Sequence, residues 1–183
     1  MKNKFIIEMQ SRGYLHQCTD LGKLEEICNK RSISAYIGFD CTASSLHVGS
    51  LLQIMILKLM QKHGHRPIVL LGGGTTLIGD PSGKDSTRKI LNQSEINRNI
   101  KSIKNVFNKI LDTKNNKTKP IFVNNANWLT KLNYIQFLRD IGLTAVADES
   151  FQSEVNVAAK VWPSEIKKQV NLINRSFPGT AEK

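Results

Sequence analysis

The 183-residue sequence contains no apolar run close to the ~20 residues that a helix needs to cross a bilayer. Its start, Met1–Glu8, carries charge but leads into no long apolar segment, so we expect no secretory signal. These absences favour a cytoplasmic protein without a membrane partner. With 40% apolar residues, the chain has the composition of a soluble protein and the length for one domain with a real core.

Cysteine is scarce as well, since Cys18, Cys28 and Cys41 are the only three. An odd number at scattered spacing predicts neither a disulfide framework nor a zinc site. We therefore expect free thiols, which suit a reducing cytoplasm.

Acidic residues are outnumbered: 26 Lys and Arg face 15 Asp and Glu, and the formal net charge is +11. Such a charge attracts polyanions, of which RNA is the obvious one. The basic residues are spread thinly, however, and a sequence rich in Lys, Asn and Ile can arise from nucleotide composition alone. RNA binding and a merely solvated surface stay open as alternatives.

Caps and hydrophobic periodicity predict alternating strands and helices. The first expected elements are a helix over 21–30 capped by Asp20, a strand over 34–39, a helix over 46–63 closed by Gly64, and a strand over 67–71. Short connections make the last three a βαβ unit, which implies a parallel sheet with a right-handed crossover.

The pattern continues more weakly towards the carboxyl end. The expected elements are a helix over 95–111 with Ser94 before it, a polar turn over 114–119, a strand over 121–124, a helix over 132–141 that stops at Gly142, and one helix over 163–174. Ligands of parallel sheets usually bind beyond the carboxyl ends of the strands. Three motif-bearing segments lie there: residues 40–50, 72–84 and 124–127.

The segment Leu46–Ser50 (LHVGS) starts the second predicted helix. A helix amino terminus offers backbone N–H groups and the positive end of the dipole, so it attracts phosphate. His47 could donate a hydrogen bond to a phosphate oxygen, and Gly49 would let a flat ring approach the backbone. Taken alone, such a histidine is more often a surface or capping residue.

The segment Tyr36–Ala43 (YIGFDCTA) directly precedes it. By itself, Tyr36 fits a core position in a strand and Asp40 fits a turn or a cap. Their closeness to His47 in the sequence favours a role in ligand binding instead. A strand end followed by polar residues and a helix start places several polar groups around one crevice.

The segment Gly72–Lys84 (GGGTTLIGDPSGK) is not a P-loop, because three residues rather than four separate the last glycine pair and no Ser or Thr follows Lys84. The dinucleotide fingerprint fails too, since leucine takes its last position. What remains is a glycine-rich strand exit and a charged loop. There Asp80 could hold an ammonium group, and Lys84 and Arg88 could reach phosphates. A solvated loop is the alternative.

Together these segments resemble tyrosyl-tRNA synthetase, a class I aminoacyl-tRNA synthetase. Residues 36–50 are similar to that family's signature YxGFDPTAxSLHxGH, and residues 64–84 are similar to its next segment. Asn124-Asn125 with Trp128-Leu129 and the FLRDIG stretch over 137–142 fit the family as well. Several long motifs in order, spread over residues 1–142, make the resemblance specific.

The resemblance implies a Rossmann-like α/β domain over 1–142 and a role for each matching residue. The expected catalytic residues are His47, Ser50, Lys84 and Arg88; the expected tyrosine-binding residues are Tyr36 and Asp80; the expected ATP- or adenylate-binding residues are Gly38, Asp40, Thr42, His47, Gly49 and Gln53. Tyr36 would read the phenol oxygen and Asp80 the ammonium group, and buried partners for a phenol hydroxyl reject phenylalanine by a factor of order 10⁴–10⁵.

The implied reaction is activation of tyrosine by ATP, in which the carboxylate attacks the α-phosphorus and pyrophosphate leaves, followed by transfer to tRNA(Tyr). Stabilising charge on the phosphates is the main task, and His47 would contribute a hydrogen bond. Mg²⁺ would accompany ATP as substrate, without a permanently bound cofactor or a protein metal site. The family forms homodimers.

Three departures bear on activity. Cys41 replaces the family's proline at a turn, and Ser50 replaces the second histidine of HIGH but can still donate to an oxygen. After Gly142 the family pattern stops, so residues 143–183 are expected to form a divergent tail and the chain to be truncated, with much of the dimer interface missing. An incomplete parallel sheet also predicts poor autonomous stability, because an edge and apolar faces are uncovered.

Two other interpretations stay open. The chain could be a non-catalytic truncated paralogue that binds tyrosine, adenylate or an intact synthetase subunit. It could also be another nucleotidyl transferase with a His-x-Gly helix start, although the similarity over residues 36–84 argues against this.

Overall fold

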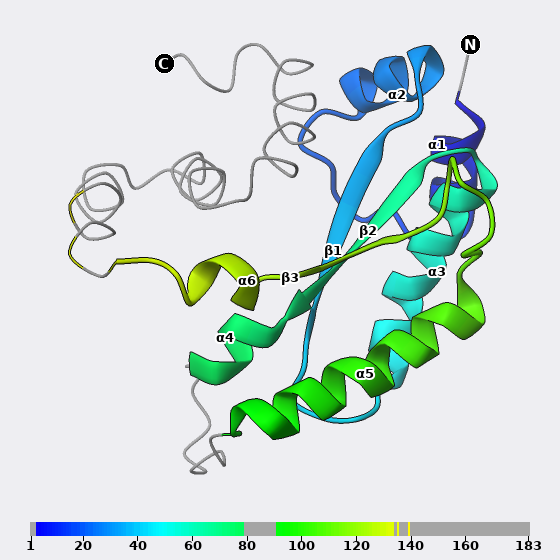
Figure 1. The fold of residues 1–183 in the computed structure, drawn as a ribbon. Helices are drawn as coiled ribbons and strands as arrows, with labels where there is room; N and C mark the ends of the chain where they lie inside the picture. Colours follow the sequence, from blue (N-terminus) through cyan, green and yellow to red (C-terminus); the bar gives the residue numbers. More distant parts are fainter. Residues whose placement is uncertain (1–2, 79–90, 134, 136–138, 140–183) are drawn as a thin grey trace. The chain divides into compact units, whose positions relative to one another are not determined.

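The structure, a computed structural model, describes residues 3–78, 91–133, 135 and 139 (Figure 1). The elements are α1 (Lys4–Ser11), α2 (Leu21–Lys30), β1 (Ser34–Asp40), α3 (Val48–Lys62), β2 (Arg66–Gly72), α4 (Gly73–Ile78), α5 (Gln93–Ile110), β3 (Ile121–Asn124) and α6 (Ala126–Leu129). The chain divides into two compact units, residues 1–126 and 127–183, and the sheet with α1–α5 belongs to the first. No described helix is long and apolar enough to cross a membrane.

The three strands form one parallel sheet in the order β1-β2-β3. β1 pairs with β2 over its whole length, from Ser34 opposite Arg66 to Asp40 opposite Gly72. β3 pairs with residues 68–71 of β2. The predicted parallel βαβ unit and α/β class are therefore confirmed, with the expected bounds of these strands and of α2, α3 and α5 within two residues of the observed ones.

One face of the sheet packs against α3 and α5, which lie on the same side of it (Figure 1). The core joins sheet residues to apolar residues of both helices: Phe39, Val69, Leu71, Ile54, Leu57, Ile96, Ile103 and Phe107. The Phe107 ring meets Phe39 edge-on at 4.8 Å between centroids. Since side chains alternate along a strand, the other face of β1 carries Tyr36, Gly38 and Asp40, all of them exposed.

The first helix, α1, was not predicted. Asn3 caps it by accepting the N–H of Phe5 (3.0 Å), and Phe5 is buried in the core. Glu8 binds Lys62 (2.8 Å) and His63 (2.9 Å) at the end of α3. Hydrogen bonds from Lys62, then from His63, lower the pKa of the Glu8 carboxyl from 4.5 to about 2. Apolar and charged contacts together fix α1 to the end of α3.

Two other predictions need correction. The glycines end β2 at Gly72 as expected, but α4 begins directly at Gly73, where a loop was expected. The residue before α5 is Asn92 and not Ser94, because Asn92 and Glu95 form a reciprocal capping box, with both hydrogen bonds at 3.0 Å. Most of the expected helix over 132–141 lies outside the described residues, as does the tail from 143, so both stay predictions, together with the domain boundary at 142.

His65, immediately before β2, is a buried titratable group. It is 3% exposed, its Nδ1 accepts the N–H of Ile33 (3.3 Å), and the Phe5 ring lies edge-on to it at 5.0 Å. Burial lowers the pKa of His65 below its ordinary value of 6.5, and the neighbouring His63 lowers it further. The folded protein therefore keeps this ring neutral where the unfolded chain protonates it.

We predict that the free energy of unfolding falls as the pH drops below 6.5, because only the unfolded chain then takes up this proton. One proton accounts for at most about 1.4 kcal/mol per pH unit. Urea unfolding of the full chain between roughly pH 8 and 5.5 measures the effect. His65→Asn keeps an acceptor for Ile33 and should flatten the dependence, whereas His16→Asn, at an exposed position, should not. Equal slopes in the two variants would contradict the assignment.

Candidate functional site at the carboxyl ends of the strands

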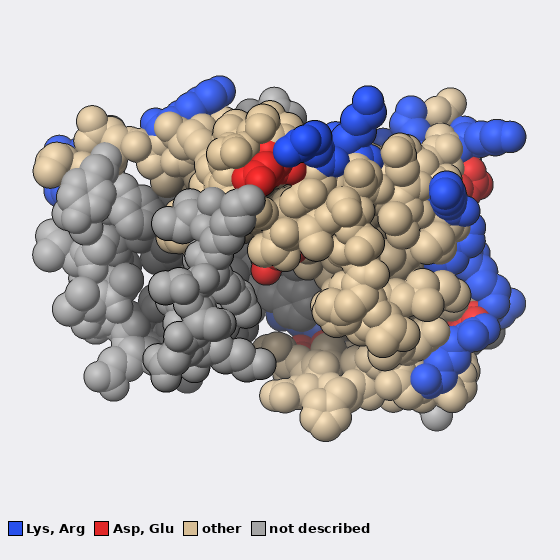
Figure 2. Space-filling view, turned by 90° about the horizontal axis from the view of Figure 1, so that it is seen from below, with Lys and Arg blue, Asp and Glu red and all other residues tan. Residues whose placement is uncertain are grey.

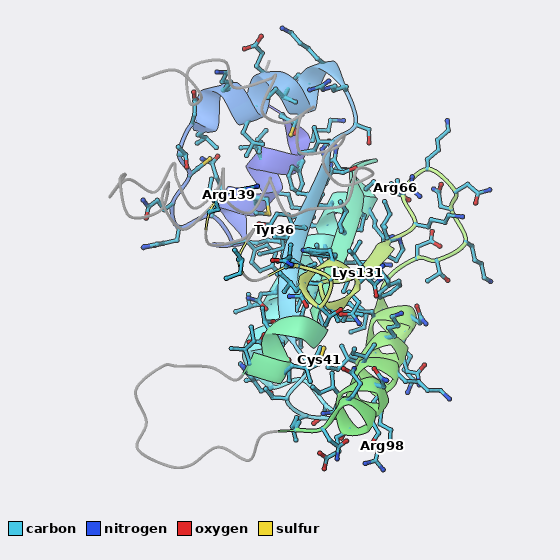
Figure 3. All side chains as sticks on the ribbon, turned by 60° about the vertical axis from the view of Figure 1, so that its left-hand side comes forward. Tyr36, Cys41, Arg66, Arg98, Lys131 and Arg139 are labelled. Atoms are coloured by element: carbon cyan, nitrogen blue, oxygen red, sulfur yellow. The ribbon has the colours of Figure 1, made fainter. Side chains whose placement is uncertain are left out.

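The carboxyl ends of the three strands lie at one edge of the sheet, and several predicted site residues lie on or beside it. Tyr36, 47% exposed, stands on the face of β1 turned away from α3 and α5, on the same side as Gly38 and Asp40. Figure 3 shows Tyr36 along β1 and Cys41 beyond its end, beside α4. The predicted contacts for tyrosine and ATP on β1 are therefore presented together on one face.

Gly72 is the buried last residue of β2 and the register partner of Asp40 on β1. A Cβ at Gly72 would lie 2.7 Å from Thr75 Oγ1 and 2.8 Å from Asp40 Oδ1, so only glycine leaves room for these side chains. The Thr75 hydroxyl donates to the Gly72 carbonyl (3.1 Å), and the N–H of Cys41 donates to Thr76 Oγ1 (3.0 Å). The exposed Asp40 carboxylate is thus placed beside the first turn of α4.

β3 contributes two asparagines to the same edge. Asn125 is 7% exposed; its Oδ1 accepts the N–H of Gly74 (2.7 Å) and its Nδ2 donates to Thr75 Oγ1 (3.3 Å). Asn124 lies so close to Gly73 that a Cβ there would be 2.9 Å from Asn124 Nδ2. The side chain of Asn125, the residue directly after β3, therefore satisfies an N–H group at the start of α4, as an N-cap residue does elsewhere.

Asn125, Thr75 and Thr76 were not among the residues predicted from the sequence to form the site. Only their position in the sequence could have indicated these residues: residues 124–127 lie at the end of one short predicted strand, and residues 72–84 follow another predicted strand. Composition alone does not reveal that the Asn125 side chain reaches the first turn of α4.

His47 is the N-cap of α3. Its Nδ1 accepts the N–H of Gly49 (2.9 Å), which places the proton of the neutral ring on Nε2. A Cβ on Gly49 would lie 2.6 Å from His47 Cε1, so the glycine keeps the space that the ring occupies. The exposed His47 is therefore both a capping residue and a hydrogen-bond donor at a helix amino terminus.

The other predicted residues fall in different surroundings. Ser50 is 8% exposed, on the core side of α3 with Ile54, whereas Thr42 and Gln53 are exposed. Ser50 is thus farther from solvent than His47, and its role as a second donor stays a prediction.

Asp80, Lys84 and Arg88 lie outside the described residues, so their roles stay predictions too. Among residues 3–78 and 91–133, no group of three His, Cys, Asp or Glu side chains could hold a metal ion.

All three cysteines are free. Cys41 is fully buried at the turn after β1, and its carbonyl accepts from Asn99 Nδ2 (2.9 Å). Burial, and secondarily the neighbouring Asp40 carboxylate, raises the pKa of the Cys41 thiol to about 11. This thiol is therefore protonated at neutral pH and acts in packing rather than as a nucleophile.

Comparison with known proteins assigns most of the chain to one group. The family of class I tRNA synthetases (W and Y) matches residues 28–152. The tyrosine–tRNA ligase of Pelagibacter ubique is 63% identical over 140 residues, which make up 76% of this chain and 34% of that protein. The ligase of Rickettsia prowazekii is 56% identical over 138 residues, with 75% and 34% covered. The chain thus spans about a third of the length of these curated relatives.

One solved structure shows a similarity to the same kind of protein. The crystal structure of a C-terminally truncated mitochondrial tyrosyl-tRNA synthetase from Aspergillus nidulans is similar to this chain with a TM-score of 0.62 at 26% sequence identity. The similarity covers 76% of this chain and 42% of that one.

We predict that Gly72→Ala lowers the free energy of unfolding by roughly 1–3 kcal/mol, because the added methyl meets Asp40, Thr75 and, at 3.3 Å, the Phe39 carbonyl oxygen. Gly38→Ala is the matched control on β1, since its Cβ would meet only Leu70 Cδ2 at 4.0 Å. Urea unfolding of both variants measures the difference. A Gly38→Ala loss as large as that of Gly72→Ala would show that the close approach at Gly72 is not the cause.

Proposed function

The chain belongs to the class I tRNA synthetases (W and Y), and we propose that it forms the tyrosine- and ATP-binding part of a tyrosine–tRNA ligase. The 63% identity to such a ligase over 140 residues carries the proposal. The proposed reaction is ATP-dependent formation of tyrosyl-adenylate and its transfer to tRNA(Tyr). Because the chain spans 34% of that relative, the whole reaction is proposed for a site of which these residues supply the first part.

The start of α3 is the proposed phosphate-binding end of the site. His47 Nε2 would donate to a phosphate oxygen, helped by the positive end of the helix dipole. As negative charge builds on the phosphates during attack by the tyrosine carboxylate, this hydrogen bond strengthens, which lowers the barrier. Gly49 would support the step by leaving the ring in its capping position. Lys84 and Arg88 are proposed to act around the leaving pyrophosphate.

The face of β1 that carries Tyr36, Gly38 and Asp40 is the proposed position of tyrosine and the adenylate. Tyr36 would contact the phenol oxygen, and Asp80 the ammonium group. Gly38 would allow close approach of the ligand, Asp40 and Thr42 would bind the adenylate, and Gln53 would lie towards the ribose. The hydrogen bonds of Thr75 and Asn125 support this assignment, because they hold the backbone against which the Asp40 carboxylate lies.

Several features of the complete enzyme are proposed from the family alone. Mg²⁺ would arrive with ATP, and we assign it no ligand among the described residues. A cytoplasmic location is proposed, in keeping with three free thiols, and a homodimer is proposed for the full-length protein. A second candidate function is a non-catalytic paralogue that binds tyrosine, adenylate or an intact synthetase subunit, and the intact motifs over residues 36–84 motivate it.

The purified chain is assayed for tyrosine-dependent exchange of pyrophosphate into ATP; we predict that His47→Ala lowers any exchange rate that the chain supports by a factor of roughly 10 to 100, the loss of one charge-assisted hydrogen bond. His16→Ala, at another exposed histidine, should leave it unchanged. No exchange in a folded sample would support the non-catalytic alternative, whereas exchange that survives His47→Ala would remove His47 from the mechanism.

We also predict that Tyr36→Phe weakens tyrosine binding by about tenfold and leaves phenylalanine binding unchanged, because it removes one neutral hydrogen bond to the phenol oxygen. Equilibrium binding of the two amino acids measures this without turnover. The matched control is Tyr14→Phe, a partly buried tyrosine outside the proposed site. Equal weakening for both amino acids would place Tyr36 in packing rather than in recognition.

A further inference from the structure

The turn directly after β1 lies between two of the proposed adenylate contacts. Cys41 is its first residue, with Asp40 before it and Thr42 after it. The similarity to the signature YxGFDPTAxSLHxGH places Cys41 where that signature has proline. A proline ring fixes φ and removes the backbone N–H, so it restrains a turn covalently. Cysteine lacks this ring, and it brings a backbone N–H group that needs a hydrogen-bond acceptor.

The N–H of Cys41 finds its acceptor in α4. It donates to Thr76 Oγ1 at 3.0 Å, and the two residues are 0% and 7% exposed. A buried N–H group without an acceptor is unfavourable, because it loses its hydrogen bond to water and gains none in return. The cysteine at this position therefore needs the Thr76 hydroxyl, whereas a proline would have no N–H to donate to it.

The carbonyl of Cys41 is held from a different helix. Asn99 of α5 donates from Nδ2 to this carbonyl oxygen at 2.9 Å. The N–H of Cys41 belongs to the planar peptide group shared with Asp40, and its carbonyl belongs to the one shared with Thr42. Side chains from α4 and α5 therefore fix the two peptide groups that join Cys41 to these proposed contacts.

Neutral groups make both of these hydrogen bonds. The ion pairs within the described part of the chain are made by Glu8 and Glu26, in α1 and α2. In the view from below, Lys and Arg side chains lie mainly along the margins of the described surface, with mostly neutral residues between them (Figure 2). Residues 42–45 after the turn are exposed, and α3 begins only at Val48. The two hydrogen bonds at Cys41 therefore restrain the connection from β1 to α3 near its start.

We propose that Thr76 and Asn99 are positioning residues for the nucleotide. Thr76, through the N–H of Cys41, replaces the restraint that a proline ring exerts at this turn, and Asn99 holds the other side of the same residue. Asp40 and Thr42 are then oriented before the nucleotide arrives, which avoids the entropic cost of ordering the turn on binding. Neither positioning residue needs to contact the ligand. The inference rests on the proposed function, because the turn has this role only where a nucleotide binds.

The test is a double-mutant cycle of Cys41→Pro and Thr76→Val in the full chain, measured by isothermal titration with ATP and, separately, with tyrosine. Valine keeps the shape of threonine but removes the acceptor. We therefore expect Thr76→Val to weaken ATP binding roughly five- to tenfold and tyrosine binding less than about twofold. In the Cys41→Pro background, where this N–H is absent, the same substitution should change ATP affinity less than about twofold.

Two further variants keep the test independent of how well proline fits. Thr76→Ser retains the hydroxyl and should bind ATP within about twofold of the parent chain. Asn99→Ala removes the donor to the Cys41 carbonyl and should weaken ATP binding roughly threefold or more. Its matched control is Asn105→Ala, an exposed asparagine of the same helix, which should leave ATP binding unchanged.

Urea unfolding of the same variants shows that each is folded under the binding conditions. Equal weakening of ATP and tyrosine binding by Thr76→Val would overturn the proposal, because a purely structural role predicts it. So would an undiminished effect of Thr76→Val in the Cys41→Pro background. Both outcomes leave the proposed function standing. A folded parent chain that binds no ATP would instead overturn the proposed function, and the positioning role with it, so the two failures are told apart by the parent chain.

Discussion

The packing of the three strand ends depends on the absence of side chains at Gly72, Gly73 and Gly74, where β2 passes into α4. Asp40 from β1 and Asn124 from β3 both approach this stretch so closely that a Cβ at Gly72 or Gly73 would collide with them. The third glycine, Gly74, donates its N–H to Asn125, so the start of α4 is held by a neighbouring strand. Glycine is unfavourable in helices, yet here tertiary hydrogen bonds and close approach outweigh its low propensity.

The hydrophobic core determines which residues are left for binding. Phe39 and Leu71 face α3 and α5, and the alternation of a strand then forces Tyr36, Gly38 and Asp40 to the other face. A shift of one residue in the register of β1 would bury these polar positions and expose Phe39. The packing of the apolar side of the strand therefore decides on which face the proposed ligand contacts lie.

Elements with strong local signals were predictable from the sequence. The helix over 21–30 has an Asp20 cap, and the strand over 121–124 has β-branched residues; both match the structure at each end. α4 was missed because its helix is held by Asn125, some 50 residues away in the chain. α1 was missed because most of its support is distant in the sequence: Glu8 pairs with Lys62 at the end of α3, and Phe5 packs against His63 and His65. For the site, motifs within one segment of the sequence were enough to predict His47 and Asp40 as candidates. Contacts between segments far apart in the sequence could be seen only in the structure.

His47 shows why the start of α3 carries a histidine where other residues are better caps. Aspartate would accept the Gly49 N–H equally well, but it would put a negative charge beside the proposed phosphates. A neutral imidazole accepts with Nδ1 and still donates with Nε2, so one side chain caps the helix and presents a donor beyond it. A doubly protonated ring would lose the acceptor and bring a positive charge to the positive end of the helix dipole. The capping bond therefore requires the neutral tautomer with its proton on Nε2, and this same tautomer can donate to the proposed phosphate.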